Sequence, residues 1–392
     1  MGVPKLRFKA DDGSDFPDWE GMTLGDVGSV AMCKRVFKEQ TREVGDVPFF
    51  KIGTFGGVPD AYISKSLFDE LKSKYAYPEV GTILLSASGT IGRQVEYQGE
   101  DAYYQDSNIV WLEHDDTVLD SYLKQFYSVV KWQGLEGSTI KRLYNKTILD
   151  TPFYRPSLPE QRKIADLLSA VDDVISAQEA EVAAWEKRKK GVMQKLFSQE
   201  VRFKADDGSD FPDWEEKTLG EVFTEIKEKN RSELPVLSVQ QGAGTVLRDS
   251  SERRIAYNKN SLNNYKAMRK GDFIIHLRSF EGGLECSNHD GISSPAYRIL
   301  RSNEILSDAF KDYFRSYTFI KGKLSDSVVG IRDGKNIDMP TFWKIQISIP
   351  SLPEQRKIAD CLTSLDDVIA KAKDELDAWR ELKKGLLQQM FV

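Results

Sequence analysis

The eleven-residue stretch PSLPEQRKIAD occurs twice, beginning at Pro156 and again at Pro350, 194 residues later. In each copy a Ser is followed by Pro and Glu, which is typical of the first turn of a helix. There the Ser hydroxyl and the Glu carboxylate cap free backbone N–H groups. The sequence therefore predicts a helix at each copy. Because a repeat of this length is not coincidental, the chain is expected to carry a duplicated scaffold.

Apolar residues continue beyond each copy at alternating spacings of three and four, which is the pattern of a coiled-coil seam. It predicts two helical arms, at residues 156–200 and 350–392, each roughly 60 Å long at ~1.5 Å per residue. We expect the arms to pack on each other rather than to be unrelated core helices. The predicted packing side chains are Ile164, Leu168, Val171, Ile175, Val182 and Trp185 in the first arm, and Ile358, Leu362, Leu365, Ile369, Leu376 and Trp379 in the second.

A second repeat, RFKADDGSDFPDWE, occupies residues 7–20 and 202–215. The first arm ends in VMQKLF and continues directly into the second copy of this segment. The second arm ends in LLQQMF at the C-terminus, while the first copy lies at the N-terminus. Joined end to end, the chain would repeat through its own junction. The sequence therefore predicts a pseudo-twofold molecule whose termini meet.

Two inserts, residues 21–155 and 216–349, lie between the repeats and have similar lengths but little alignable sequence. Strands are expected near 49–54, 94–97 and 109–112, and helices near 120–130 and 308–317. The matching stretches TLGDV and TLGEV near the start of each insert are interpreted as a turn plus a buried strand. The predicted domains are residues 1–155 and 201–349, each mixed and rich in short strands.

Charge and composition limit the function classes. The net charge of −6 is unusual for a nucleic-acid binder, so any DNA-binding surface has to be a local patch. No apolar run approaches the ~18 residues of a membrane span, and the start lacks a signal-peptide core. Three scattered cysteines fit a reducing compartment, so we expect a cytoplasmic protein. Cys286 and His289 have a metal-like spacing but no second ligand pair, so no metal site is predicted.

Motifs for catalysis are missing from the sequence. The stretch around Lys335 lacks the spacing of a phosphate-binding loop, and no Gly-rich fingerprint follows a strand. No Asn/Asp-Pro-Pro-aromatic tetrad is present to hold a flipped base. The sequence therefore predicts a chain that performs no reaction itself and binds no cofactor.

Polar loops follow the buried strands of both inserts and are candidates for DNA contacts. Arg can read guanine, Gln and Asn can read adenine, and Lys, Ser and Thr suit phosphates. Solvated turns use the same residue types, so each loop alone is open to that interpretation too. The candidates are Ser88, Thr90, Arg93, Gln94, Tyr104, Gln105, Lys141 and Arg142 in the first insert, and Gln240, Gln241, Arg278, Ser279, Arg332, Lys335 and Asn336 in the second.

The whole chain resembles the specificity subunit of type I restriction-modification systems. The resemblance rests on the repeated PSLPEQRKIAD with VDDVI or LDDVI after it, on W…TLGEV at the start of the inserts, and on GSTIKRL and GIRDGKN before the arms. It implies an α+β fold, with two mixed α/β target-recognition domains joined by two long antiparallel coiled-coil helices in a pseudo-twofold internal repeat. Each domain would read one half of a bipartite site in double-stranded DNA, with the helices as a ruler for the unread spacer.

The resemblance also implies partners. The helices would dock two modification (methyltransferase) subunits, and restriction (translocase/nuclease) subunits would join that complex. S-adenosylmethionine, ATP and Mg are then expected only on the partner subunits. Two alternatives remain from the residues alone. One is a fused enzyme with its own methyltransferase or nuclease, and the other is an orphan or scaffold subunit whose inserts bind protein instead of DNA.

Overall fold

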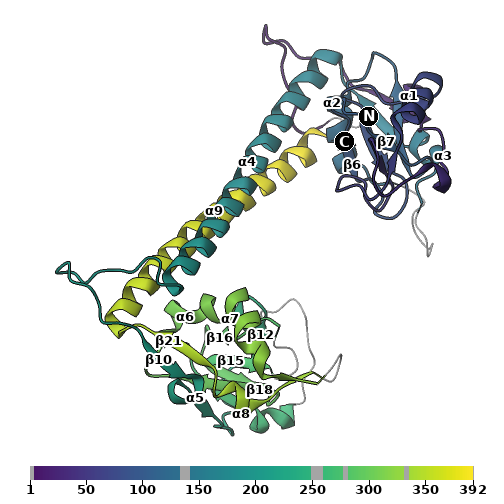
Figure 1. The fold of residues 1–392 in the computed structure, drawn as a ribbon. Helices are drawn as coiled ribbons and strands as arrows, with labels where there is room; N and C mark the ends of the chain where they lie inside the picture. Colours follow the sequence, from purple (N-terminus) through teal and green to yellow (C-terminus); the bar gives the residue numbers. More distant parts are fainter. Residues whose placement is uncertain (1–3, 133–141, 249–258, 277–280, 331–334, 392) are drawn as a thin grey trace. The chain divides into compact units, whose positions relative to one another are not determined.

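Each insert folds around a four-stranded antiparallel sheet, and the strand order is the same in both. The computed structural model describes residues 4–132, 142–248, 259–276, 281–330 and 335–391 (Figure 1). It divides into two compact units, Met1–Glu179 with Glu375–Val392 (unit 1) and Ala180–Asp374 (unit 2). Each unit therefore holds one insert with half of each arm, whereas the sequence suggested four consecutive segments.

The sheet of unit 1 has the order β2-β8-β5-β6. A smaller sheet, β4-β3-β7, packs beside it and contains one parallel pair, β3 with β7. The bounds are β1 Glu20–Thr23, β2 Gly28–Ala31, β3 Val47–Phe50, β4 Tyr62–Ile63, β5 Ile83–Ser86, β6 Gln94–Glu96, β7 Tyr103–Tyr104, β8 Ile109–His114 and β9 Pro152–Arg155, with helices α1 Lys65–Lys74, α2 Asp120–Val129 and α3 Asn145–Leu149. Strands β1 and β9 pair where the insert begins and ends.

The sheet of unit 2 has the equivalent order β11-β18-β15-β16, and β10 pairs with β21 as β1 pairs with β9. The bounds are β10 Glu215–Thr218, β11 Thr224–Ile226, β12 Leu237–Gln240, β13 Gly244–Leu247, β14 Lys266–Met268, β15 Phe273–His276, β16 Glu285–Cys286, β17 Gly291–Ser293, β18 Tyr297–Arg301, β19 Val328–Val329, β20 Asn336–Ile337 and β21 Gln346–Ile349, with helices α5 Leu219–Val222, α6 Ser307–Phe314, α7 Tyr317–Gly322 and α8 Met339–Phe342. The two inserts thus share the four-stranded sheet and the strand pair at their ends, while their remaining strands pair differently.

The arms are the helices α4 (Leu158–Phe197) and α9 (Leu352–Met390). In unit 1, Ile164 of α4 shares an apolar cluster with Met390 of α9, and in unit 2 Leu196 shares one with Ile358. The start of each helix therefore packs beside the end of the other, so they run antiparallel. The structure places every predicted packing side chain on a buried or half-buried position, the half-buried ones being Ile175, Trp185, Leu365 and Trp379.

Matching ion pairs join the arms within each unit. Lys383 Nζ lies 2.5 Å from Asp172 Oδ1 in unit 1, and Lys189 Nζ lies 2.6 Å from Asp366 Oδ1 in unit 2. Lys383 follows Lys189 by 194 residues and Asp366 follows Asp172 by 194 residues, the same offset as the repeated helix start. The internal twofold predicted from the repeats therefore extends to single side-chain contacts.

The repeated Glu does not cap its helix, which corrects the interpretation of the PSLPEQRKIAD motif. Glu160 is fully buried and accepts hydrogen bonds from Arg7 Nη2 at 2.8 Å and Trp19 Nε1 at 3.0 Å. Glu354 does the same with Arg202 and Trp214. A buried carboxylate requires a cation, and the RFKADDGSDFPDWE segment supplies it. The hydroxyls of Ser157 and Ser351 have no hydrogen-bond partner among the described residues.

The TLGDV and TLGEV stretches form single helical turns instead of a turn plus a buried strand. The Thr23 hydroxyl donates to Asp26 Oδ2 at 2.8 Å, and the Thr218 hydroxyl donates to Glu221 Oε2 at 2.7 Å. These carboxylates also accept from the Thr backbone N–H, which fixes the start of a helix. The predicted strands at 94–97 and 109–112 are confirmed as β6 and β8, and the predicted helix at 120–130 as α2. The strand predicted at 49–54 is wrong beyond residue 50, because β3 ends at Phe50 and a turn follows. The helix predicted at 308–317 corresponds to α6, which ends at Phe314.

The termini meet, as the repeats predict, and both lie in unit 1 (Figure 1). The Leu6 N–H donates to the Gln389 carbonyl at 2.9 Å. At the matching place in unit 2, where the chain is continuous, the Val201 N–H donates to the Lys195 carbonyl at 3.2 Å. The same contact therefore forms with and without a covalent connection.

Candidate functional site

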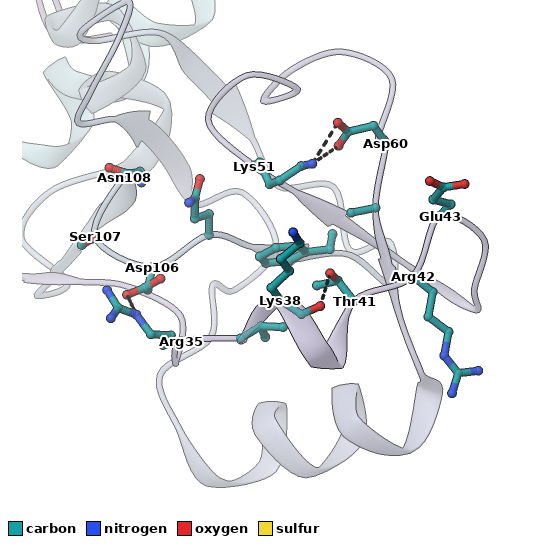
Figure 2. Close-up of a pocket in the computed structure, with 14 residues that line it drawn as sticks. Arg35, Lys38, Thr41, Arg42, Glu43, Lys51, Asp60, Asp106, Ser107 and Asn108 are labelled. Carbon is teal, nitrogen blue, oxygen red and sulfur yellow. Dashed lines mark hydrogen bonds and ion pairs between the residues drawn. The ribbon is translucent and has the colours of Figure 1, made fainter.

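A recess in unit 1 gathers polar side chains from three segments that are far apart in the sequence. It has a volume of about 690 Å³ and is lined by the segment after β2, by β3 with the loop that follows it, and by the turn between β7 and β8. Its lining residues are Arg35, Val36, Lys38, Thr41, Arg42, Glu43, Phe49, Lys51, Asp60, Ala61, Gln105, Asp106, Ser107 and Asn108 (Figure 2). We call this site the recess.

Four cations and three carboxylates line the recess, and two of the cations are paired. Figure 2 shows Arg35 beside Asp106, with Nε 2.9 Å from Oδ2, and Lys51 beside Asp60, with Nζ 2.8 Å from Oδ1. Lys38 and Arg42 are exposed, and no carboxylate among the described residues pairs with them. The recess therefore has a cationic rim within a unit whose insert carries more acidic than basic residues.

The turn at residues 105–108 is held from several sides. Gln105 Oε1 accepts from the Ile52 N–H at 2.9 Å, and Asn108 Oδ1 accepts from the Ser88 hydroxyl at 3.0 Å. Arg142 Nη2 donates to the Ser107 carbonyl at 3.1 Å. Ser107 has a φ of 55°, a left-handed conformation that is uncommon outside Gly and costs free energy. The side chains on this turn are therefore fixed in direction by the surrounding protein.

Three residues predicted from the sequence meet at this turn, while others do not. Gln105 lines the recess, whereas Ser88 and Arg142 donate hydrogen bonds to Asn108 and Ser107 of the turn. Thr90 is exposed but is not part of the recess lining. Arg93 and Gln94 are also outside the lining. Arg93 donates to the Phe55 carbonyl, and Gln94 contacts Ser128 of α2. Lys141 lies outside the described residues.

The prediction that Tyr104 contacts DNA is wrong. Its side chain is 2 % exposed and stacks on Phe50, with 5.8 Å between the ring centroids. Its hydroxyl points to Glu100, at 3.4 Å. The neighbouring Tyr103 is buried as well, because both belong to β7 between two packed layers. Successive side chains of a strand point to opposite faces, so one of Tyr103 and Tyr104 would be exposed if one face of β7 met solvent. Both faces of β7 are covered, so both side chains are buried.

In unit 2 the polar side chains lie on a β-hairpin instead. Strands β12 and β13 are joined through residues 240–244, which we call the hairpin tip. Glu285, 6 % exposed, accepts from the Gly242 N–H at 2.7 Å and the Gly244 N–H at 3.2 Å. Arg315 donates to the Gly242 carbonyl at 2.6 Å, and Asn288 donates to the Ala243 carbonyl at 2.7 Å. The backbone of the tip is thus fixed at three consecutive residues.

Gln240 and Gln241 are the exposed side chains of the hairpin tip. Neither side-chain amide has a hydrogen-bond partner among the residues that the structure describes. Gln241 also lines a smaller cavity of about 220 Å³ with His276, Glu285 and Tyr297. Lys335 and Asn336 are exposed at the start of β20, and Arg278, Ser279 and Arg332 lie outside the described residues.

The cations of the recess are the functional candidates that the sequence interpretation missed. Arg35, Lys38 and Arg42 fall within eight residues of an otherwise acidic insert. This local density of positive charge was the available signal. Lys51 joins them only through the pairing of β3 with β4 and β7, which the sequence does not reveal.

Within the described ranges, the structure contains no group of three metal-ligating side chains and no helix long and apolar enough to cross a membrane. Burial raises the pKa of the Cys33 thiol to about 12 and that of Cys286 to about 11. Both thiols stay protonated near neutral pH, which makes them poor nucleophiles. The side chains that stand out chemically are therefore hydrogen-bonding groups suited to binding.

The comparisons with known proteins agree on one group. A family model described as type I restriction modification DNA specificity domain matches residues 17–184 and 212–378. A putative type I restriction enzyme specificity subunit of Haemophilus influenzae is 54% identical over 155 residues, which cover 39% of this chain and 40% of that relative. The type I restriction enzyme MjaVIII specificity subunit of Methanocaldococcus jannaschii is 26% identical, covering 98% of this chain and 95% of the relative.

Solved structures share the fold at low sequence identity. The S subunit of a type I restriction-modification system from M. genitalium has a TM-score of 0.56 and 17% identity, and the match covers 100% of this chain and 99% of that chain. A chain from a structure that describes complex assembly and conformational transition of the type I R-M system has a TM-score of 0.53 and 16% identity, covering 96% and 98%.

Proposed function

The chain belongs to the family of type I restriction modification DNA specificity domains, and from this premise we propose that unit 1 and unit 2 each read one half of a bipartite DNA site. The observation that carries the proposal is the contrast between the units. The four-stranded sheet and its connection to the arms are the same in both, whereas the polar surface differs between recess and hairpin tip. A duplicated scaffold with two different polar surfaces suits two different half-sites.

The arms are proposed to set the length of the unread spacer and to dock two modification subunits. The two matching ion pairs, Lys383–Asp172 and Lys189–Asp366, hold the register of the helices in each unit. Leu158 and Leu352, at matching positions, are 37% and 41% exposed, which offers the same apolar contact twice. Inserting four residues after Phe197, about one helical turn, should change the spacer and leave both half-sites unchanged.

The chain is further proposed to be non-catalytic. S-adenosylmethionine, ATP and Mg would be bound by modification and restriction subunits, and this chain would supply only the choice of sequence. Methyl transfer to DNA by the purified chain alone would contradict it.

The experiment is to co-express the chain with its cognate modification subunits and to map adenine methylation across the host genome. We expect a bipartite motif with a fixed unread gap, and replacing either insert should change one half-site only. A short continuous motif would contradict the two-domain proposal. Full and unaltered methylation without this chain would favour the alternative of a scaffold that binds protein.

A further inference from the structure

Around Arg35 the recess presents unpartnered hydrogen-bond donors, while the neighbouring carbonyls of Gln105 and Asn108 and the carboxylate of Asp106 each already accept a protein hydrogen bond. Gln105 Oε1 accepts from Ile52, Asn108 Oδ1 accepts from Ser88, and Asp106 Oδ2 accepts from Arg35. The amide NH₂ groups of Gln105 and Asn108 have no partner among the described residues. Both Nη groups of Arg35 are likewise left without one. Donors therefore predominate among the unpartnered polar groups around Arg35.

A surface rich in hydrogen-bond donors distinguishes between the bases. In the major groove guanine offers two neighbouring acceptors, N7 and O6, whereas adenine offers the N7 acceptor and an N6 donor. A Gln or Asn side chain reads adenine through its N–H and its C=O together. The carbonyls of Gln105 and Asn108 each already accept a protein hydrogen bond that fixes their direction, whereas their NH₂ groups are without a partner among the described residues, which weakens their ordinary paired reading of adenine.

Arg35 is the best-placed donor. Its side chain is 60% exposed, whereas that of Asp106, which holds its Nε, is only 19% exposed. The guanidinium is a planar fork, so fixing Nε fixes the direction of both Nη groups. A side chain held in this way loses less conformational entropy when it binds. The left-handed Ser107 and its contact with Arg142 keep Asp106 in place.

We propose that the recess reads a guanine in the half-site of unit 1, with Arg35 as the base-contacting residue and Asp106 as its positioning residue. Gln105 adds a further donor toward an acceptor on the same DNA face. The exposed Lys38 and Arg42 on the rim would contact phosphates, which position the protein without reading sequence. This inference rests on the proposed function, because it names the base that one of its two domains selects.

The test uses the complete complex with its modification subunits and maps adenine methylation for Arg35→Ala, Arg35→Lys and Asp106→Asn. Arg35→Ala is expected to relax one guanine position in one half-site by about 10- to 100-fold in discrimination. The other half-site and the spacer should stay as in the wild type. Asp106→Asn should relax the same position more weakly. Lys146→Ala, a change of an exposed cation outside the recess, is the matched control and should leave the motif unchanged.

An unchanged motif with Arg35→Ala, or relaxation at a position that is not guanine, would overturn the inference while leaving the proposed function intact. If Arg35→Ala abolishes methylation, Arg35→Lys decides, because it keeps the charge but loses the fork. Relaxation at one guanine with Arg35→Lys would support the inference, and an unchanged motif would overturn it. A wild-type complex without a bipartite motif would instead overturn the proposed function itself.

Discussion

Unit 1 fixes the side chains of its polar turn, whereas unit 2 fixes the backbone of its hairpin tip. In unit 1 the carbonyl oxygens of Gln105 and Asn108 are held by protein donors. In unit 2 Glu285, Arg315 and Asn288 hold the backbone from Gly242 to Gly244 and leave the amides of Gln240 and Gln241 with both donor and acceptor. One sheet can thus support two kinds of hydrogen-bonding surface.

The largest effect should come from the feature that the units share. Replacing Glu160 or Glu354 by Ala leaves a half-buried Arg and a Trp N–H without their acceptor. We expect each change to lower the free energy of unfolding by about 3–5 kcal/mol. Chemical denaturation followed by Trp fluorescence measures this, with exposed Arg162→Ala as control. A loss confined to one of the two variants would show that the two scaffolds are not equivalent.

The second prediction addresses the backbone contacts that hold the hairpin tip of unit 2. Glu285→Ala removes the acceptor of the Gly242 and Gly244 N–H groups. We expect stability to fall by about 2–3 kcal/mol and discrimination to weaken in one half-site only. Methylation mapping and denaturation of the complex check both effects, and exposed Glu281→Ala is the control. Weakening of both half-sites would contradict the assignment of the tip to one of them.

The third prediction concerns the amides themselves. Both the N–H and the C=O of Gln241 are without a partner among the described residues, so it can read adenine, whereas the C=O of Gln105 is already held by the Ile52 N–H. Gln241→Ala should reduce discrimination at one A·T pair roughly 10-fold in the half-site that Arg35→Ala leaves intact. Exposed Gln346→Ala is the matched control in the methylation map. An effect in the same half-site as Arg35→Ala would remove the distinction between the two surfaces.

The smallest effect is a difference in acid sensitivity where each domain meets the arms. In unit 2, Asp312 of α6 lies 2.5 Å from Lys189 of α4, whereas in unit 1 the neutral Gln125 of α2 contacts Asp172 at 3.2 Å. Burial would raise the pKa of Asp312, but the hydrogen bonds and charges of Lys189 and Arg315 outweigh it and hold the pKa below its ordinary value of 3.8.

A carboxyl whose pKa is depressed by folding stabilises the protein above its unfolded pKa. That contribution is lost as the pH falls through the lower, folded pKa. We therefore expect Asp312→Asn to reduce the loss of stability between neutral pH and values below about 4, by about 1 kcal/mol or less. Denaturation of wild type and Asp312→Asn across this range measures it. If Asp312→Asn leaves the loss of stability at low pH unchanged, Asp312 is not a source of the acid sensitivity.

The scaffold could be predicted from the sequence because its signals are local or repeated. The spacing of Ile164, Leu168 and Val171 predicts a helix seam, and the repeated segments predict that the termini meet. The role of Glu160 could not be predicted, because its partner Arg7 lies 153 residues away and a Glu in a first turn usually caps. Most of the recess is likewise formed by segments brought together only by folding. Gln105 was found because its turn follows a strand, and Tyr104 was misassigned for the same reason.

The two matching hydrogen bonds at the arm ends differ in the chain entropy that is lost when they form. The Val201–Lys195 hydrogen bond closes a loop of a few residues, whereas the Leu6–Gln389 bond closes nearly the whole chain. Closing a loop about sixty times longer costs roughly 4 kcal/mol more in chain entropy, at ~0.6 kcal/mol per doubling. The end of α9 should therefore join unit 1 late in folding and separate early under stress. Its Phe391 ring, stacked on Tyr122 at 5.3 Å between centroids, is placed to offset part of that cost.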